Sequence, residues 1–243
     1  MIHEDITLGP VRLILGDCLK IAPTLTGIDA VITDPPFSAR THSGHDATQG
    51  RDGQQRAKLG YAAWTDVEVS AVACLLPRRG WACFITDHTL ASCWEQRLRE
   101  SGRYVFAPVP VVSRGRSVRL TGDGPSSWTD WLVVSRTKHE LKWGTLPGVY
   151  EGAAGQIEHM GGKPVNAMCQ IVQDYSRTGD TVLDICAGAG TTLIAAIRTG
   201  RRAIGIEIDP KHYKTAVERV RRELAQCTLP FEQPKPAVQE VLI

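Results

Sequence analysis

Short runs of consecutive apolar residues recur along the chain, and segments with helical periodicity separate several of them. Apolar runs without alternation are typical of strands that a parallel sheet buries on both faces. The predicted strands are Val11–Leu15, Ile28–Thr33, Trp81–Thr86, Tyr104–Val112, Trp131–Ser135, Thr181–Ile185 and Ala203–Ile208. The predicted helices are Asp66–Leu76, Leu90–Ser101, Pro164–Thr178, Thr191–Thr199 and Pro210–Ala225. This pattern predicts an α/β fold with a largely parallel sheet and helices on both faces.

Composition adds little to this picture. A chain of 243 residues with 42% hydrophobic and 22% charged residues is typical of one globular domain. The net charge of +2 does not by itself indicate a nucleic-acid partner. Seven cysteines without a Cys-x-x-Cys pair, no signal peptide and no long apolar run predict a cytoplasmic protein without a membrane span. The dispersed histidines predict no metal site.

The tetrapeptide Asp34-Pro35-Pro36-Phe37 follows the predicted strand Ile28–Thr33 directly. Proline has no N–H and a fixed φ, and it pushes the preceding residue to an extended conformation. The carbonyls of this segment are therefore held rigidly and have no ladder partners. A carboxylate before them and an aromatic ring after them could grip a planar ring that carries an amine. The alternative interpretation is a proline-rich turn after a strand.

A second motif spans Thr181–Thr192 and reads as a strand, a glycine turn with Gly188 and Gly190, and the start of a helix. The next predicted strand carries Glu207 near its end. In nucleotide-type sites, glycines let the backbone approach the ligand and an acid on the next strand binds ribose hydroxyls. The alternative is a purely structural turn.

The charge around this turn indicates which ligand it suits. A dinucleotide motif would have a third glycine, where this chain has Leu193. Asp184 would repel a pyrophosphate, but it would attract an ammonium group. S-adenosylmethionine carries an ammonium, a ribose and an adenine without any phosphate, so the motif favours this ligand.

Together these motifs resemble those of the amino-methyltransferases that act on DNA bases, in which Asp-Pro-Pro-aromatic and Asp-x-x-x-Gly-x-Gly-Thr signatures share one domain. The catalytic motif comes first, which is similar to the circularly permuted β group, including phage and prophage enzymes. Leu15-Gly16-Asp17 and His159-x-x-x-Lys163-Pro164 resemble two further motifs, and the resemblance covers about residues 10–225. Phe37 stands where Tyr or Trp is commoner, and Cys186 stands where Phe is usual.

The resemblance implies a Rossmann-like, S-adenosylmethionine-dependent methyltransferase fold in a single domain, 1–243. In this interpretation Asp34 and the Pro35 carbonyl accept hydrogen bonds from an exocyclic base amine, and Phe37 stacks on the flipped base. Pro36 completes the catalytic motif. The implied cofactor-binding residues are Asp17, His159, Lys163, Pro164, Asp184, Cys186, Ala187, Gly188, Gly190, Thr191, Thr192 and Glu207. The reaction requires no metal.

Double-stranded DNA is the implied partner. Three polar, glycine-rich segments interrupt the α/β pattern, and we expect them to form recognition loops at 38–60, 113–127 and 139–158. Basic side chains there suit phosphate contacts, although a solvated charged face is the alternative. The candidates are Arg40, Arg51, Arg56, Lys58, Arg114 and Arg116. Such a small recognition region predicts a short target site and help from a homodimer.

The leading Asp34 favours adenine as the target, because Ser-Pro-Pro more often accompanies cytosine 4-amino methylation in this family. Cytosine 4-amino methylation is therefore the nearest alternative. The absence of a Pro-Cys dipeptide argues against carbon-5 methylation of cytosine. A non-catalytic DNA-binding relative, a nicotinamide-dependent oxidoreductase, and methylation of RNA or protein glutamine are further alternatives.

Overall fold

The computed structural model describes residues 2–41, 62–77, 79–115, 128–138, 144–153 and 162–227. Its strands are β1 (Ile2–Leu8), β2 (Val11–Gly16), β3 (Ala30–Thr33), β4 (Trp81–Thr86), β5 (Tyr104–Val105), β6 (Val109–Arg114), β7 (Thr129–Arg136), β8 (Tyr150–Ala153), β9 (Thr181–Asp184) and β10 (Arg202–Glu207). Within the described ranges they form one ten-stranded sheet in the order β1-β2-β10-β9-β3-β4-β7-β6-β8, and β5 pairs with β7.

The centre of the sheet is parallel, and its strand order reverses between β9 and β3. Strands β2, β10, β9, β3 and β4 all run parallel to their neighbours in this central group. From β3 the chain continues to β4 on one side, whereas from β9 it continues to β10 on the other side. In open α/β sheets, ligands bind at the carboxyl ends of the strands at such a reversal. The topology therefore directs attention to the ends of β3 and β9.

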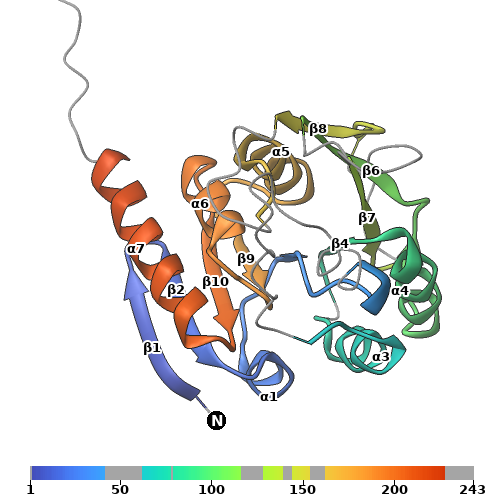
Figure 1. Cartoon of the computed structure of the whole chain (residues 1–243), viewed down its shortest axis with the longest axis horizontal. Coiled ribbons are helices and arrows are strands. Elements are labelled where there is room, and N and C mark those ends of the chain that lie inside the picture. Colours follow the sequence, from blue (N-terminus) through green and yellow to red (C-terminus); the bar gives the residue numbers. More distant parts are fainter. Residues whose placement is uncertain are drawn as a thin grey trace, which may run out of the picture.

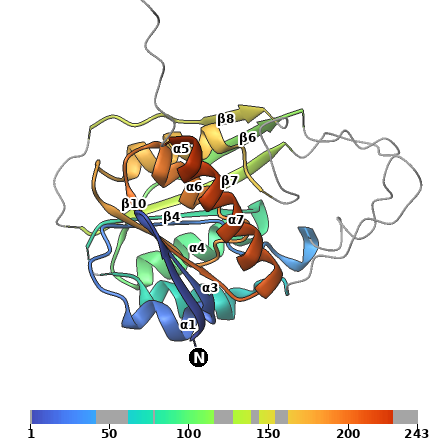
Figure 2. The same cartoon turned by 90° about the vertical axis from the view of Figure 1, so that its left-hand side faces the viewer.

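Helices cover both faces of this sheet (Figures 1 and 2). One layer contains α1 (Cys18–Ile21), α3 (Asp66–Leu75) and α4 (His88–Glu100), with the 3₁₀ turn η1 (Ala22–Thr24) after α1. The other layer contains α5 (Val165–Tyr175), α6 (Thr191–Arg198) and α7 (Pro210–Cys227). This arrangement confirms the predicted fold class.

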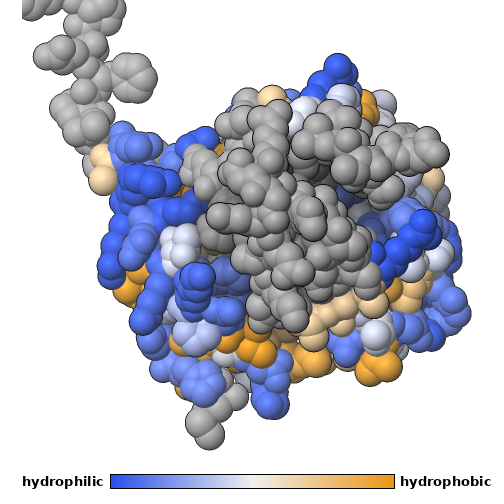
Figure 3. Space-filling model, in the orientation of Figure 1, coloured by the Kyte–Doolittle hydropathy of each residue, from blue (hydrophilic) through white to orange (hydrophobic). Residues whose placement is uncertain are grey.

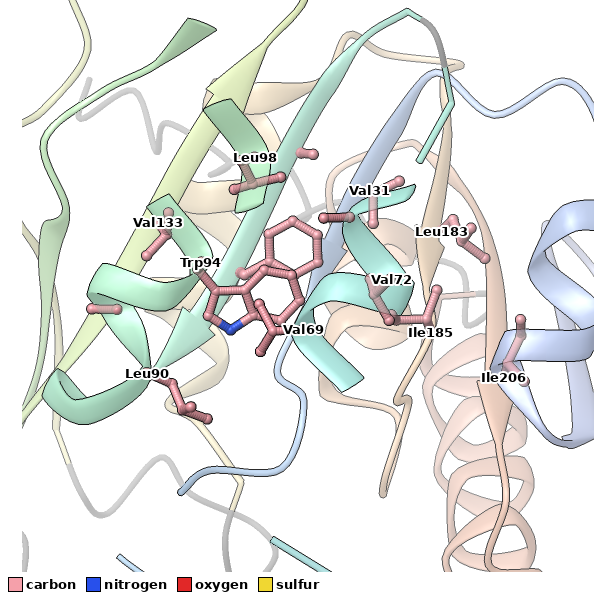
Figure 4. Packing of buried hydrophobic residues seen from close by; sticks show 14 of the residues in the cluster. Val31, Val69, Val72, Leu90, Trp94, Leu98, Val133, Leu183, Ile185 and Ile206 are labelled. Atoms are coloured by element: carbon pink, nitrogen blue, oxygen red, sulfur yellow. The ribbon is translucent and has the colours of Figure 1, made fainter. Parts of the chain in front are cut away.

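A hydrophobic core between α3, α4 and the sheet supports the strand ends on one side (Figure 4). Trp94 of α4 is fully buried and stacks on Phe84 of β4, with ring centroids 3.9 Å apart. Val31 and Leu183 bring β3 and β9 into the same cluster. Burying one such side chain contributes about 1.5–3 kcal/mol, so this cluster holds the two strands firmly in register.

The structure divides one expected strand and adds two strands that the sequence did not predict. The run predicted as one strand, Tyr104–Val112, is divided into β5 and β6, and Pro108 lies in the gap between them. Proline cannot donate a ladder hydrogen bond, so it interrupts the strand there. Strands β1 and β8 were not predicted because their residues are too polar to stand out as apolar runs. Strand β8 lies inside the segment 139–158 that we expected to be a recognition loop.

The surface is uneven in character. Hydrophilic residues cover the side formed by α7, and hydrophobic residues gather at the rim near α1 and α3 (Figure 3). Leu19 and Val67 contribute exposed side chains to these two helices. Among the helices of the described ranges, none has the length and apolar character that crossing a membrane requires.

Candidate active site

The ends of β3 and β9 are joined by a hydrogen bond between side chains. The hydroxyl of Thr33, the last residue of β3, donates to Oδ1 of Asp184 at 2.6 Å. The backbone N–H of Cys186 donates to the same oxygen at 3.1 Å. Asp34, the first residue of the proline motif, therefore lies next to the cofactor-type motif that begins at Asp184. The structure brings the two predicted motifs together at the reversal of strand order.

Burial changes the chemistry of Asp184. This side chain is almost fully buried, and desolvation raises its pKa from 3.8 to about 6. Hydrogen bonds from Thr33, Thr192 and Cys186 oppose that rise, and the nearby charge of Asp34 adds to it. A carboxyl group in this state gains from a cationic partner, which the ammonium of S-adenosylmethionine would supply.

Lys163 contacts the proline motif in space, although it lies far from it in the sequence. Its Nζ is 2.9 Å from Oδ2 of Asp34 and 3.4 Å from Oδ2 of Asp130. The same ammonium lies 4.5 Å from the centroid of the Phe37 ring. The sequence resemblance implies a cofactor role for Lys163, and in the structure its ammonium also lies beside two predicted catalytic residues, Asp34 and Phe37. Pro164 follows and forms the N-cap of α5.

The segment after the proline motif is anchored to β4. Asp87 follows β4, and its Oδ2 accepts hydrogen bonds from the N–H and hydroxyl of Ser38. The hydroxyl of Thr41 donates to the same oxygen, and the N–H of Trp64 donates to the carbonyl of Phe37 at 3.1 Å. Pro35 is buried, whereas Pro36 and Phe37 are half-buried. The motif is thus fixed at its base while its ring stays partly accessible.

Gly188 and Gly190 have different roles in the glycine turn. Gly190 has a left-handed φ of +83° at the N-cap of α6, which other residues adopt only with strain. An added Cβ at Gly188 would meet no described atom within 4 Å, so the backbone is open to a ligand on that side. The turn also hydrogen-bonds to the sheet, because the N–H of Ala187 donates to the carbonyl of Ile206 at 2.9 Å. Thr191 and Thr192 begin α6.

The missing third glycine of the motif has a replacement on the neighbouring strand. In the dinucleotide motif that glycine allows close packing of helix on strand. Here Leu193 of α6 fills the position, and Gly205 of β10 faces it. An added Cβ at Gly205 would lie 2.8 Å from Cδ1 of Leu193 and 3.1 Å from Cβ of Ala187. The close packing is therefore kept, with the small residue on the strand.

Glu207 closes the turn from the end of β10. Its Oε2 accepts a 2.7 Å hydrogen bond from the N–H of Gly188. Its Oε1 accepts hydrogen bonds from the N–H groups of Ile208 and Asp209 at 2.9 and 2.8 Å. Arg219 of α7 holds the other side of the turn, since its guanidinium donates to the carbonyl of Ala189. The carboxylate is thus buried and oriented beside the glycine backbone.

Asp17 and Cys186 are the remaining predicted cofactor residues that the structure describes. Asp17 is the N-cap of α1 and accepts a 3.0 Å hydrogen bond from the N–H of Leu19. It also pairs with Lys20 at 3.2 Å. The thiols of Cys18 and Cys186 are hydrogen-bonded to each other, which lowers the pKa of Cys18. Cys186 is the position at which the sequence resemblance led us to expect a phenylalanine.

The DNA-binding candidates are described only in part. Arg40 is exposed just beyond the proline motif. Arg114 lies at the end of β6 and pairs with Glu151 of β8 at 2.8 Å, and both side chains are largely exposed. Candidates outside the described residues are Arg51, Arg56, Lys58, Arg116 and the predicted cofactor residue His159.

Sequence reasoning missed three polar residues that support this site. Asp130 is a buried carboxylate that directly precedes the apolar run Trp131–Val134 in β7, and that position is the signal that could have revealed it. Asp87 and Thr33 each follow or end an apolar run, at the edge of the sheet where site residues are expected. No cluster of three or more metal-ligating side chains occurs among the residues that the structure describes.

Comparisons with known proteins agree with this geometry. Residues 126–218 match a family described as DNA methylase, of the N6 and N4 type. YubD of Escherichia coli strain K12, a candidate methylase by its name, is 25% identical over 216 residues, which cover 86% of this chain and 89% of that protein. The match extends over most of the length of both chains.

Two solved structures share the fold. The complex of M1.HpyAVI with S-adenosylmethionine has a TM-score of 0.65 at 19% identity, and the alignment covers 86% of this chain and 98% of that chain. The PvuII DNA methyltransferase, described as cytosine-N4-specific, has a TM-score of 0.66 at 14% identity and covers 93% and 96%. At these identities the likeness shows the fold, which is that of S-adenosylmethionine-dependent methyltransferases.

Proposed function

We propose that this protein is a DNA amino-methyltransferase that transfers a methyl group from S-adenosylmethionine to the 6-amino group of adenine. The observation that carries this proposal is the junction of the two motifs, in which Thr33 bonds Asp184 and sets Asp34 beside it. A methyl donor bound on the glycine turn would lie next to an amine held by the proline motif. The family match over residues 126–218 supports the same reaction class.

The residues around the glycine turn suit S-adenosylmethionine. Asp184 is a buried carboxylate that gains from a cation, and the ammonium of the ligand would provide it. The open side of Gly188 leaves space for the ligand, and Glu207 is oriented beside that space for the ribose hydroxyls. When bound, the ligand supplies an electrophilic methyl group.

Asp34 and Phe37 would prepare the target base. The lone pair of an exocyclic amine is delocalised into the ring, which makes the nitrogen a poor nucleophile. Hydrogen bonds from its N–H groups to Asp34 and the Pro35 carbonyl favour a pyramidal nitrogen. The N–C bond would then form as the S–C bond breaks, the donor would leave as a neutral thioether, and the nitrogen would release one proton to solvent. Stacking on Phe37 contributes about 1–3 kcal/mol toward holding the flipped base.

Cytosine 4-amino methylation is the second candidate, and a specific observation favours it. The PvuII enzyme, described as cytosine-N4-specific, has the same fold over 93% of this chain. The exocyclic amine of cytosine presents the same two N–H donors to Asp34 and the Pro35 carbonyl. We prefer adenine because an aspartate leads the motif. A non-catalytic DNA-binding relative is the alternative from a different functional class. We also predict that the protein acts on DNA as a homodimer.

One experiment separates these candidates. The protein is incubated with methyl-labelled S-adenosylmethionine and unmethylated DNA, and the DNA is digested to nucleosides. Label in 6-methyladenine is expected, whereas label in 4-methylcytosine would move the protein to the second candidate. Absence of transfer by the wild-type protein, together with intact DNA binding, would favour the non-catalytic alternative.

A further inference from the structure

The ammonium of Lys163 lies between two carboxylates that come from different strands. Asp34 follows β3, and Asp130 belongs to β7 on the other side of β4. The Lys163 side chain is 4% exposed and that of Asp130 is 7% exposed, so both charges are withdrawn from water. A buried charge is tolerated when it is paired and hydrogen-bonded, and removing one partner is costly. The ion pair between Lys163 and Asp130 is therefore buried, and it is more costly to disrupt than an ion pair on the surface.

The same ammonium also touches the aromatic part of the proline motif. Its distance of 4.5 Å from the Phe37 ring centroid is within the range of a cation–π contact. One group thus contacts both the carboxylate that would accept from the target amine and the ring that would stack on the base. Lys163 precedes Pro164, which caps α5, so the main chain that carries the ammonium is attached to a well-packed helix.

We propose that Lys163 is a positioning residue for methyl transfer, which orients Asp34 and Phe37 toward the incoming amine while Asp130 holds its ammonium in place. This inference rests on the proposed function. An ionised carboxylate has about four lone-pair sites, so an oxygen held by Lys163 does not prevent Asp34 from accepting from the amine. Fixing one oxygen of Asp34 fixes the direction of the other.

Positioning of this kind acts on the rate of the chemical step. Positive charge passes from the sulfonium to the target nitrogen during transfer, and a carboxylate held at a fixed place stabilises that charge without reorganising. Misplacing a reacting group by about 1 Å can cost about 100-fold in rate. Because the ammonium of Lys163 lies against Asp34 and the ring of Phe37, its loss should act on the held amine and leave the affinity for S-adenosylmethionine nearly unchanged.

The test is steady-state kinetics of Lys163→Met, which keeps the length and apolar stem of the side chain but removes the ammonium. We expect kcat to fall by about 100-fold and the KM for S-adenosylmethionine to change by less than about threefold. Asp130→Asn should lower kcat by about tenfold, a smaller loss because the amide oxygen still accepts from Nζ. Arg103→Met serves as the control, since Arg103 is also buried and cationic, and it donates hydrogen bonds to Ser135 and to the carbonyls of Pro77 and Gly80. It should lose stability and keep kcat.

Rescue by a small amine distinguishes positioning from a merely structural role. In Lys163→Ala, added n-propylammonium should restore kcat at least about tenfold, whereas propan-1-ol, which has a similar shape and no charge, should not. A raised KM for S-adenosylmethionine with unchanged kcat would show that Lys163 is a cofactor ligand and would overturn the proposal.

Three further outcomes are decisive. If Lys163→Met does not fold, an Asp130→Asn protein that folds and has wild-type kcat overturns the proposal by itself. If the wild-type protein transfers no methyl group to DNA, the proposed function fails and this inference falls with it. A wild-type enzyme that is active, with a Lys163→Met variant equal to it, overturns only the inference.

Discussion

The hydroxyl of Thr33 donates a 2.6 Å hydrogen bond to the carboxylate of Asp184 and so joins the ends of β3 and β9. These two strands lie where the strand order of the sheet reverses. Asp34, the residue after Thr33, begins the proline motif, and Asp184 is the last residue of β9 before the glycine turn. One buried hydrogen bond thus connects the part of the site that would hold the base with the part that would hold the methyl donor.

The raised pKa of Asp184 predicts a pH-dependent stability. Its folded pKa is about 6 against an ordinary value of 3.8, so the folded protein binds this proton more tightly than the unfolded chain does. The resulting contribution, about 3 kcal/mol, is full below about pH 4 and is lost as the pH rises through about 6. Urea unfolding of wild type and Asp184→Asn at pH 4–8 measures it.

We expect Asp184→Asn to remove much of this pH dependence while keeping an oxygen that accepts from Thr33 and Cys186. Its free energy of unfolding near pH 8 should equal or exceed that of the wild type. Its affinity for S-adenosylmethionine, measured by calorimetry, should fall at least about tenfold because the anionic partner of the ammonium is gone. Unchanged affinity would remove Asp184 from the cofactor site.

Thr33→Val tests the hydrogen bond between the two strands. Valine has a similar shape but cannot donate, so the Asp184 carboxylate loses a partner that lowers its pKa. The pH at which affinity for S-adenosylmethionine is half lost should therefore shift upward. Binding titrations between pH 5 and 8 would detect the shift, and Thr33→Ser should restore the wild-type profile. An identical profile in Thr33→Val would contradict this account.

Asp34→Asn should separate catalysis from cofactor binding. The amide has one acceptor oxygen and no charge, so it holds the target amine weakly and stabilises little positive charge in the transition state. We expect kcat to fall by about 100-fold or more, while the Kd for S-adenosylmethionine stays within about threefold of the wild-type value. Single-turnover kinetics with labelled donor, compared with calorimetry, provides both numbers.

Glu207→Gln should weaken the glycine turn. Glutamine can accept from the N–H groups of Ile208 and Asp209, but its amide nitrogen cannot accept from Gly188. Loss of a hydrogen bond to a charged group costs about 1.5–3 kcal/mol. The free energy of unfolding should fall by about that amount, and affinity for S-adenosylmethionine should fall with it. A variant with full affinity would show that Glu207 only supports the turn.

Gly205→Ala tests the packing that replaces the third glycine. The added methyl group would lie 2.8 Å from Cδ1 of Leu193, so the Leu193 side chain or α6 has to move. Overpacking of this kind costs about 1–3 kcal/mol. In the double variant with Leu193→Ala the contact with Leu193 is relieved and only the 3.1 Å approach to Cβ of Ala187 is left, so the two losses of stability should be less than additive. Additive losses in denaturant unfolding would refute this contact.

Local pattern alone was sufficient for most of the elements around the site. The runs at Trp81–Thr86 and Thr181–Ile185 predicted β4 and β9 closely, because a buried strand must be apolar wherever it lies in the sheet. The proline and glycine motifs were equally local, since each depends on backbone conformations that neighbouring residues impose. Strand β8 escaped because its few residues have no such signature.

The sequence by itself therefore determined the fold class, the two motifs and the expectation that they serve one site. Tertiary structure alone decided which side chains meet there. The sequence assigned Lys163 to the cofactor, and it did not predict that the ammonium of Lys163 lies 2.9 Å from Asp34 and 3.4 Å from Asp130. Such contacts depend on strand order and on where α5 begins relative to β3 and β7. No local sequence pattern can predict contacts between residues that are far apart in the chain, because only the packed sheet brings their charges together.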